Sequence, residues 1–120
     1  MKQILTVDDS ASIRQMVSFT LTRAGYGVAE AIDGQDGLEK SGRQKYDLII
    51  TDLNMPRMDG IEMITAVRKL SGYGFTPILM LTTESQAEKK EAGRKAGATG
   101  WIVKPFNADQ LLAVVQKLVK

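Results

Sequence analysis

The chain has 120 residues, with 16 basic and 14 acidic side chains and a formal net charge of +2. It contains neither cysteine nor histidine, which excludes a disulfide scaffold, a metal centre built on those ligands and a catalytic triad that uses histidine. Apolar residues make up 43% and charged residues 25%, which indicates a folded globular domain, and so mild a charge balance argues against a nucleic-acid-binding surface.

Short apolar runs alternate with longer helical patterns along the chain. We predict strands over residues 3–7, 27–30, 47–51, 77–82 and 100–103. The first, third and fourth of these contain ILTV, LIIT and ILML. Such near-continuous apolar runs are typical of strands that are buried on both faces of a parallel sheet.

Helical patterns fill the intervals between these strands. Apolar side chains recur at helical spacing over residues 13–24, and Gly25 ends that segment. Asp33 is expected to open the next helix. Capping boxes, in which a short polar side chain is followed three residues later by Glu or Gln, predict further helix starts at Asp59, Ser85 and Asn107. The helix expected over 85–96 has the weakest pattern, because Gly93 lies in its interior.

Five β–α units predict an α/β fold with a doubly wound, five-stranded parallel sheet and helices on both faces. We expect a single domain over residues 1–120, with no second, output domain. No secretory signal or membrane-spanning apolar run is visible, so a cytoplasmic location is expected. Ligands of such sheets bind beyond the carboxyl ends of the strands, and chemistry is expected there.

Polar residues stand at the carboxyl ends of four predicted strands: Asp8 and Asp9, Asp52, Thr82, and Lys104. Clustered carboxylates repel one another, and a hard divalent cation relieves that repulsion, so we predict Mg²⁺, or Mn²⁺, rather than zinc. The central, single Asp52 is the candidate nucleophile for an aspartyl phosphate, whose oxygens Thr82 and Lys104 would bind. Asp9 and Ser10 have an alternative interpretation as caps of the first helix.

Four segments together resemble the receiver domains of bacterial two-component signalling, in particular the single-domain chemotaxis type (CheY-like). They are ILTVDDS at 4–10, DLIITDLNMPRMDG at 47–60, PILMLTTES at 77–85 and AGATGWIVKPF at 96–106. They are spread over the chain in the family's order. The resemblance implies a flavodoxin-like (βα)5 fold with strand order 2-1-3-4-5.

The resemblance also implies a role for each matching residue. Asp52 would accept a phosphoryl group from a histidine kinase. The other implied roles are Mg²⁺ ligation by Asp8, Asp9, Asp52 and Asn54, phosphoryl binding by Thr82 and Lys104, switching by Thr82 and Trp101, and dephosphorylation control by Asn54 and Glu84. The peptide before Pro105 is expected to be cis. Most family members carry Tyr or Phe where this sequence has Trp101, so the switch departs from the family's pattern.

The implied protein is a signalling switch that assists its own phosphorylation and dephosphorylation, not an enzyme with other substrates. Its expected partners are a histidine kinase and an output protein such as a flagellar motor switch component, with no nucleic acid, no membrane and a monomeric state. The basic residues of 89–95 favour an acidic output partner. Three alternatives stay open. The protein could be a phosphorelay intermediate, an adaptor that acts outside chemotaxis or is never phosphorylated, or a phosphohydrolase that uses an aspartate nucleophile.

Overall fold

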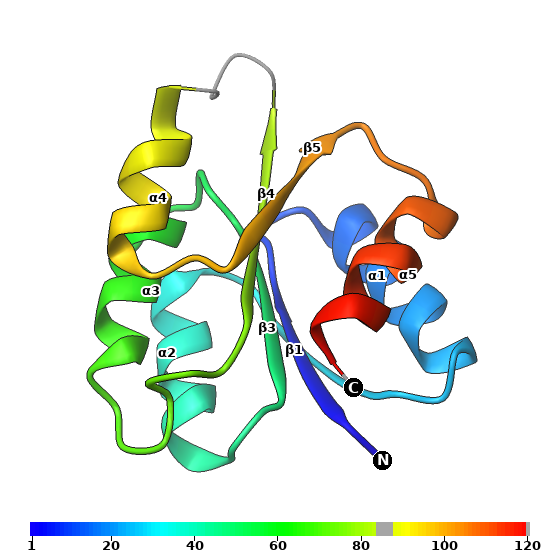
Figure 1. The fold of residues 1–120 in the computed structure, drawn as a ribbon, viewed down its shortest axis with the longest axis horizontal. Coiled ribbons are helices and arrows are strands. Elements are labelled where there is room, and N and C mark those ends of the chain that lie inside the picture. Colours follow the sequence, from blue (N-terminus) through cyan, green and yellow to red (C-terminus); the bar gives the residue numbers. More distant parts are fainter. Residues whose placement is uncertain (84–87, 120) are drawn as a thin grey trace.

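A single parallel sheet forms the centre of the molecule (Figure 1). The computed structural model describes residues 1–83 and 88–119. Within these ranges the strands are β1 (Gln3–Val7), β2 (Gly27–Ala31), β3 (Leu48–Asp52), β4 (Ile78–Thr83) and β5 (Gly100–Lys104). They pair in the order β2-β1-β3-β4-β5, every pair parallel. The predicted flavodoxin-like topology is confirmed, and no strand end differs by more than one residue from its prediction.

Helices cover both faces of this sheet. They are α1 (Ala11–Arg23), α2 (Gly34–Arg43), α3 (Gly60–Arg68), α4 (Lys90–Ala96) and α5 (Ala108–Leu118). Figure 1 shows α2, α3 and α4 on one side and α1 and α5 on the other. Among the described residues, no helix is both long enough and apolar enough for a membrane span.

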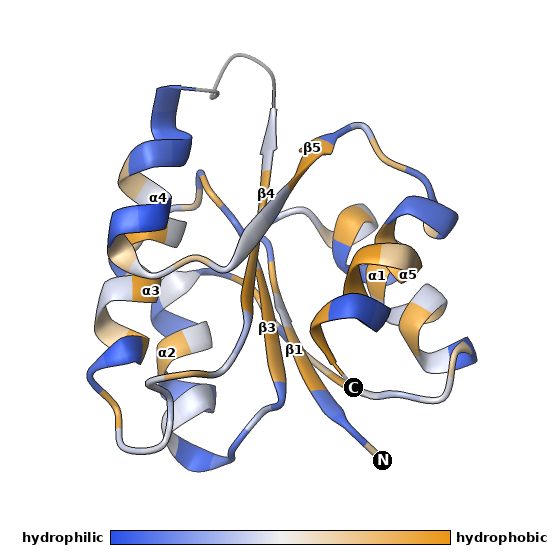
Figure 2. Cartoon of the chain, viewed as in Figure 1, coloured by the Kyte–Doolittle hydropathy of each residue, from blue (hydrophilic) through white to orange (hydrophobic). Residues whose placement is uncertain are grey.

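The two faces of the sheet bury separate apolar clusters. One cluster joins alternate strand residues such as Leu5 and Ile49 to Met63 and Val67 of α3. The other cluster lies on the opposite face of the sheet. It joins strand residues such as Ile4 to Leu21 of α1 and Val115 of α5. Figure 2 shows β1, β3 and β4 as strongly hydrophobic and much of α4 as hydrophilic. Burial on both faces explains why these strands read as continuous apolar runs.

Local capping fixes where most helices begin. Ser10 Oγ accepts a hydrogen bond from the Ile13 N–H at 3.3 Å, so Ser10 rather than Asp9 caps α1. Asp33 caps α2, and the capping boxes predicted at Asp59 and Asn107 are both present. These caps leave the carboxylate of Asp9 available for another role.

The fourth helix differs from its prediction over 85–96. Among the described residues α4 begins at Lys90, after a 3-10 turn at residues 88–89, and Lys89 at its N-cap makes no side-chain capping hydrogen bond. The predicted cap Ser85 lies outside these residues. Gly93 was expected to weaken this helix, but a Cβ at that position would lie 2.8 Å from Met80 Cε of β4. The glycine therefore lets α4 pack closely on the sheet. Arg68 donates hydrogen bonds to the carbonyl of Gly97, which secures the end of α4.

Candidate functional site

The acidic residues at the ends of β1 and β3 meet in one cluster. Asp52 is the last residue of β3, and Asp8 follows β1, its neighbour in the sheet. One carboxylate oxygen each from Asp8, Asp9 and Asp52 lies within 4.8 Å of the others. Asp8 is completely buried, Asp52 is nearly so, and Asp9 is exposed. The parallel sheet therefore brings the three predicted aspartates together at its carboxyl edge.

Lys104 at the end of β5 reaches across to this cluster. Its Nζ lies 3.0 Å from Asp52 Oδ1 and 3.5 Å from Asp8 Oδ2. One ammonium group thus faces two carboxylates, and the cluster of three acids keeps an excess of negative charge. The Lys104–Pro105 peptide is cis, as the resemblance implies.

Asp8 carries the electrostatic cost of this arrangement. Burial raises the pKa of its carboxyl, and the negative charges of Asp52 and Asp9 raise it further, against the lowering effects of the Ser10 N–H and Lys104. Its Oδ1 accepts the hydrogen bond from Ser10 at 2.9 Å, whereas its buried Oδ2 accepts none from the described residues. A buried oxygen that lacks a hydrogen bond, beside two further carboxylates whose charge one ammonium group does not balance, suits a hard divalent cation.

An open cavity adjoins the exposed side of the cluster. It is lined by Asp9, Asn54, Met55, Arg57, Asp59 and Glu62. Asn54 thus lines the same cavity as Asp9, and its role as a metal ligand stays a prediction. The lining is strongly polar, and a donor set made only of oxygen atoms favours Mg²⁺ or Mn²⁺ over softer metals.

Thr82 and Trp101 lie on the two strands beyond Asp52. Leu81 of β4 is in register with Asp52, which places Thr82 one residue beyond it. The Thr82 Oγ1 is buried and has no hydrogen-bond partner among the described residues. Trp101 of β5 is half-buried, and Lys90 Nζ of α4 lies 5.5 Å from the centroid of its ring. Glu84, predicted to control dephosphorylation, lies outside the described residues.

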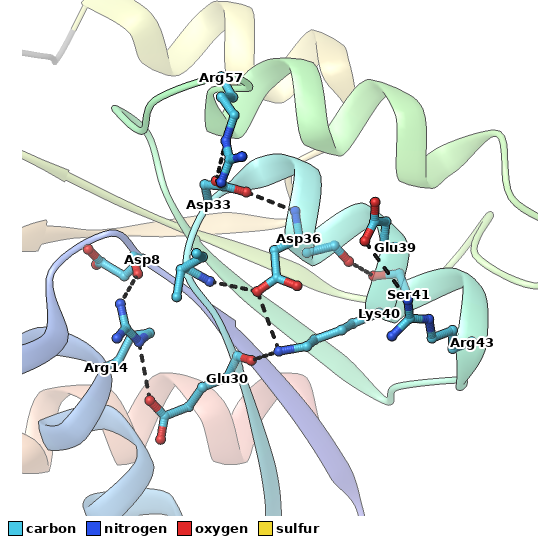
Figure 3. Close-up of polar contacts among 12 residues, drawn as sticks. Asp8, Arg14, Glu30, Asp33, Asp36, Glu39, Lys40, Ser41, Arg43 and Arg57 are labelled. Carbon is cyan, nitrogen blue, oxygen red and sulfur yellow. Dashed lines mark hydrogen bonds and ion pairs between the residues drawn. The ribbon is translucent and has the colours of Figure 1, made fainter.

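Two arginines support the loops of the site, and sequence reasoning missed both. Arg14 of α1 donates from Nη1 to the main-chain oxygen of Asp8 at 2.7 Å and from Nε to Glu30 at 3.2 Å (Figure 3). Arg57 donates from Nε to Asp33 Oδ2 at 2.9 Å. Glu30 and Asp33 are 16 and 24 residues away from the arginines they contact, so no local pattern could have predicted these pairs.

Comparison with known proteins defines the class of this molecule. Residues 4–116 match the response regulator receiver domain family, and the chain belongs to that family. Receiver domains are signalling switches of two-component systems, which take a phosphoryl group from a histidine kinase and act on output partners.

Particular relatives refine this picture. The chain is similar to the chemotaxis protein CheY4 of Vibrio cholerae, with 56% identity, 98% coverage of both chains and a TM-score of 0.94. It is also similar to the receiver domain of the Pseudomonas aeruginosa histidine kinase PA1611, with 27% identity and a TM-score of 0.91 over 98% of this chain and 97% of that one. The PA1611 structure has a magnesium ion coordinated in its active site cleft. The response regulator ArlR of Staphylococcus aureus is 38% identical over the whole chain, which spans about half (53%) of that relative.

Proposed function

We propose that this chain is a stand-alone receiver that is phosphorylated on Asp52 in a Mg²⁺-dependent reaction. The observation that carries the proposal is the contact of Lys104 Nζ with Asp52 Oδ1, at 3.0 Å, inside a cluster of three carboxylates. An Asp52 oxygen would attack the phosphorus of a phosphohistidine. The P–O bond forms as the P–N bond breaks, and the electron pair leaves with the imidazole nitrogen, which takes up a proton.

The side chains around Asp52 have complementary tasks in this proposal. The ammonium of Lys104 balances charge on the phosphoryl oxygens. The hydroxyl of Thr82, which has no hydrogen-bond partner among the described residues, donates a hydrogen bond to one of them. Mg²⁺ would be held by Asp8, Asp9, Asp52 and the main-chain oxygen of Asn54, and when bound it neutralises the carboxylates and the phosphoryl group. The magnesium ion in the PA1611 receiver supports this assignment.

The fate of the phosphoryl group involves residues around this core. Asn54 and Glu84 are proposed to flank the path of the water that hydrolyses the aspartyl phosphate. Thr82 and Trp101 are proposed to transmit phosphorylation to the face formed by α4, β5 and α5. A local charge thereby biases a two-state equilibrium, as in other phosphorylation switches.

We further infer a role in chemotaxis, with a histidine kinase as phosphodonor and an output protein such as a flagellar motor switch component. The similarity to the chemotaxis protein CheY4 over 98% of both chains supports this pathway and a single-domain protein. A monomeric state is part of the proposal. The basic residues of α4 favour an acidic output surface, although Arg94 is already paired with Glu91. The proposal places the protein in the cytoplasm, where kinases have access to ATP. A phosphorelay intermediate or an adaptor is the alternative.

The test is phosphorylation of the purified chain by candidate histidine kinases and by a small acyl phosphate, with and without Mg²⁺. Reduction by borohydride converts an aspartyl phosphate to homoserine, which mass spectrometry locates. We expect homoserine at position 52 and no label in Asp52→Asn. Label at another residue, or labelling that is equal with Mg²⁺ and with EDTA, would overturn the proposal. Pull-down with the phosphorylated form then distinguishes the motor component from other output partners.

A further inference from the structure

The two loops that carry the acidic cluster are both tied to the segment where β2 leads into α2, residues 30–36. The loop after β1 is tied through Arg14, which contacts the main-chain oxygen of Asp8 and the carboxylate of Glu30. The loop after β3 is tied through Arg57, which contacts Asp33 (Figure 3). Strand β2 pairs only with β1, at the edge of the sheet. The main-chain N–H of Asp8 also donates to the carbonyl of Ala31 at 3.1 Å, so the arginine side chains add to a main-chain connection between this segment and the loop after β1.

Each tie joins a largely buried side chain to a more exposed one. The Arg14 side chain is 16% exposed and its partner Glu30 42%, whereas Asp33 is 2% exposed and its partner Arg57 67%. A Cβ at Gly34 would lie 2.3 Å from the main-chain oxygen of Met58, so the loop after β3 rests directly on the start of α2. Arg57 has a φ of 67°, in the left-handed region that side chains rarely adopt, so its backbone conformation needs support from such contacts.

Neither arginine pairs with a carboxylate of the acidic cluster. Arg57 lines a cavity together with Asp9, Asp59 and Glu62, yet its guanidinium pairs with Asp33. Arg14 contacts the main-chain oxygen of Asp8 rather than its carboxylate. In the described part of the chain, no arginine or lysine forms an ion pair with Asp9. The two arginines therefore hold the acidic loops without pairing with the carboxylates that they present.

We propose that Arg14 and Arg57 are positioning residues, which fix the loops after β1 and β3 to the β2–α2 segment in the geometry that binds a divalent cation. The inference rests on the metal site of the proposed function. In this inference the β2–α2 segment supplies no metal ligand itself. It holds in place the loops that carry the ligands. Groups that hydrogen-bond directly to metal-ligating side chains commonly affect affinity 10–100-fold, and because these arginines hold the loops rather than the ligating atoms, we expect an effect at the lower end of that range.

The sign of the effect separates positioning from simple electrostatics. Removing a positive charge near an acidic cluster strengthens cation binding if charge alone matters, and most strongly at low ionic strength. Removing a residue that positions the ligands weakens binding. Arg43 provides the matched control, because it is a 75% exposed arginine of α2 whose ion pair, at 4.0 Å, is with Glu39 of the same helix.

The experiment measures Mn²⁺ binding by the loss of the free-ion EPR signal, with Mg²⁺ competition, for wild type, Arg14→Gln, Arg57→Gln and Arg43→Gln. We expect roughly tenfold weaker binding for Arg14→Gln and for Arg57→Gln. Arg43→Gln should bind as wild type or slightly more tightly. Arg14→Lys and Arg57→Lys, which keep the charge but lose the planar fork, should fall between glutamine variant and wild type. Thermal unfolding without metal confirms that each variant is folded.

Two results would overturn the inference. If both glutamine variants bind Mn²⁺ as tightly as wild type or more tightly, the arginines act as charges or not at all, while the metal site itself stands. If the folded wild type binds neither Mn²⁺ nor Mg²⁺, the metal site of the proposed function fails, and the positioning role fails with it.

Discussion

Lys104 Nζ lies 3.0 Å from Asp52 Oδ1, and among the described residues it is the cation that forms an ion pair with the proposed phosphoacceptor. The same nitrogen lies 3.5 Å from the buried Asp8 Oδ2. One lysine thus moderates the repulsion between two carboxylates that come from different strands. Several stability predictions depend on this balance, because a buried carboxylate without a counter-charge is costly.

Replacing Lys104 should destabilise the metal-free protein. Lys104→Met leaves Asp8 and Asp52 facing each other, and we expect the free energy of unfolding at pH 7 to fall by about 2 kcal/mol. Mg²⁺ should stabilise this variant more than wild type, because the ion takes over the missing positive charge. Urea unfolding with EDTA and with Mg²⁺ measures both effects. Lys117→Met, at an exposed position of α5, is the control and should change little. An unchanged stability of Lys104→Met would contradict the expected balance.

Asp8 should destabilise the metal-free fold at neutral pH. Burial and the neighbouring negative charges raise the pKa of its carboxyl above the ordinary 3.8, so folding favours the protonated form. The protonated Asp8 carboxyl stabilises the fold fully at pH values below its ordinary pKa. This stabilisation is lost as the pH rises through the raised pKa. Asp8→Asn should therefore raise the Tm at pH 7 by on the order of 3 °C and give little advantage near pH 3.5. It should also abolish stabilisation by Mg²⁺. Calorimetry at both pH values, with and without Mg²⁺, is the measurement, and a lower Tm of Asp8→Asn at pH 7 would count against this account.

Asp33 should show the opposite pH dependence. Its hydrogen bond from the Asp36 N–H, at 2.8 Å, and its contact with Arg57 lower the pKa of its carboxyl. The stability that Asp33 contributes is present at pH values above the ordinary pKa of 3.8. It is lost as the pH falls through the lowered pKa. Asp33→Ala should cost about 1 kcal/mol at pH 7, since it removes the cap of α2.

Asp33→Asn separates the two contributions of this residue. It keeps the cap but loses the titration, so its stability should decline less than that of wild type as the pH falls from about 5 to 3. Urea midpoints across this range provide the comparison. Identical pH profiles for wild type and Asp33→Asn would show that Asp33 does not contribute to acid unfolding.

The parallel sheet and the edge at which the site residues gather could be predicted because both follow from one regularity, whereas the strand order was implied by the family resemblance. Buried parallel strands leave continuous apolar runs, and each run ends at the same edge of the sheet, which is why Asp52 and Lys104 meet from positions 52 residues apart. The two arginines that hold the loops of the site could not be predicted, because their contacts follow no such regularity. Arg14 and Arg57 contact distant partners that have no fixed spacing, and nothing in the sequence shows which acidic residue each arginine will contact.

The role of Gly93 likewise depends on a distant contact, and it leads to a comparison of two helical glycines. A Cβ at Gly93 would lie 2.8 Å from Met80 Cε, whereas a Cβ at Gly42 in α2 meets nothing within 4 Å. Gly42→Ala should stabilise the protein by up to about 1 kcal/mol. Gly93→Ala should lose that gain or destabilise, because Met80 is buried and must move. Thermal unfolding of both variants tests this. Met80→Leu shortens the opposing side chain and should make Gly93→Ala tolerable; equal gains from the two alanines would refute the close packing of α4.

Met80 is also in register with Trp101, so the packing of α4 on β4 lies next to the proposed reporter of the switch. Trp101 is the single tryptophan, and it is half-buried with the ammonium of Lys90 near its ring. If phosphorylation at Asp52 shifts α4 against β5, the environment of the indole must change. We expect Mg²⁺ with beryllofluoride, a phosphoryl mimic, to alter Trp101 emission in wild type and to leave Asp52→Asn unchanged. Lys90→Met should alter the resting spectrum, since it removes the cation–π contact, without preventing the response. A wild-type spectrum that stays constant while the mimic binds would mean that the switch does not pass through Trp101.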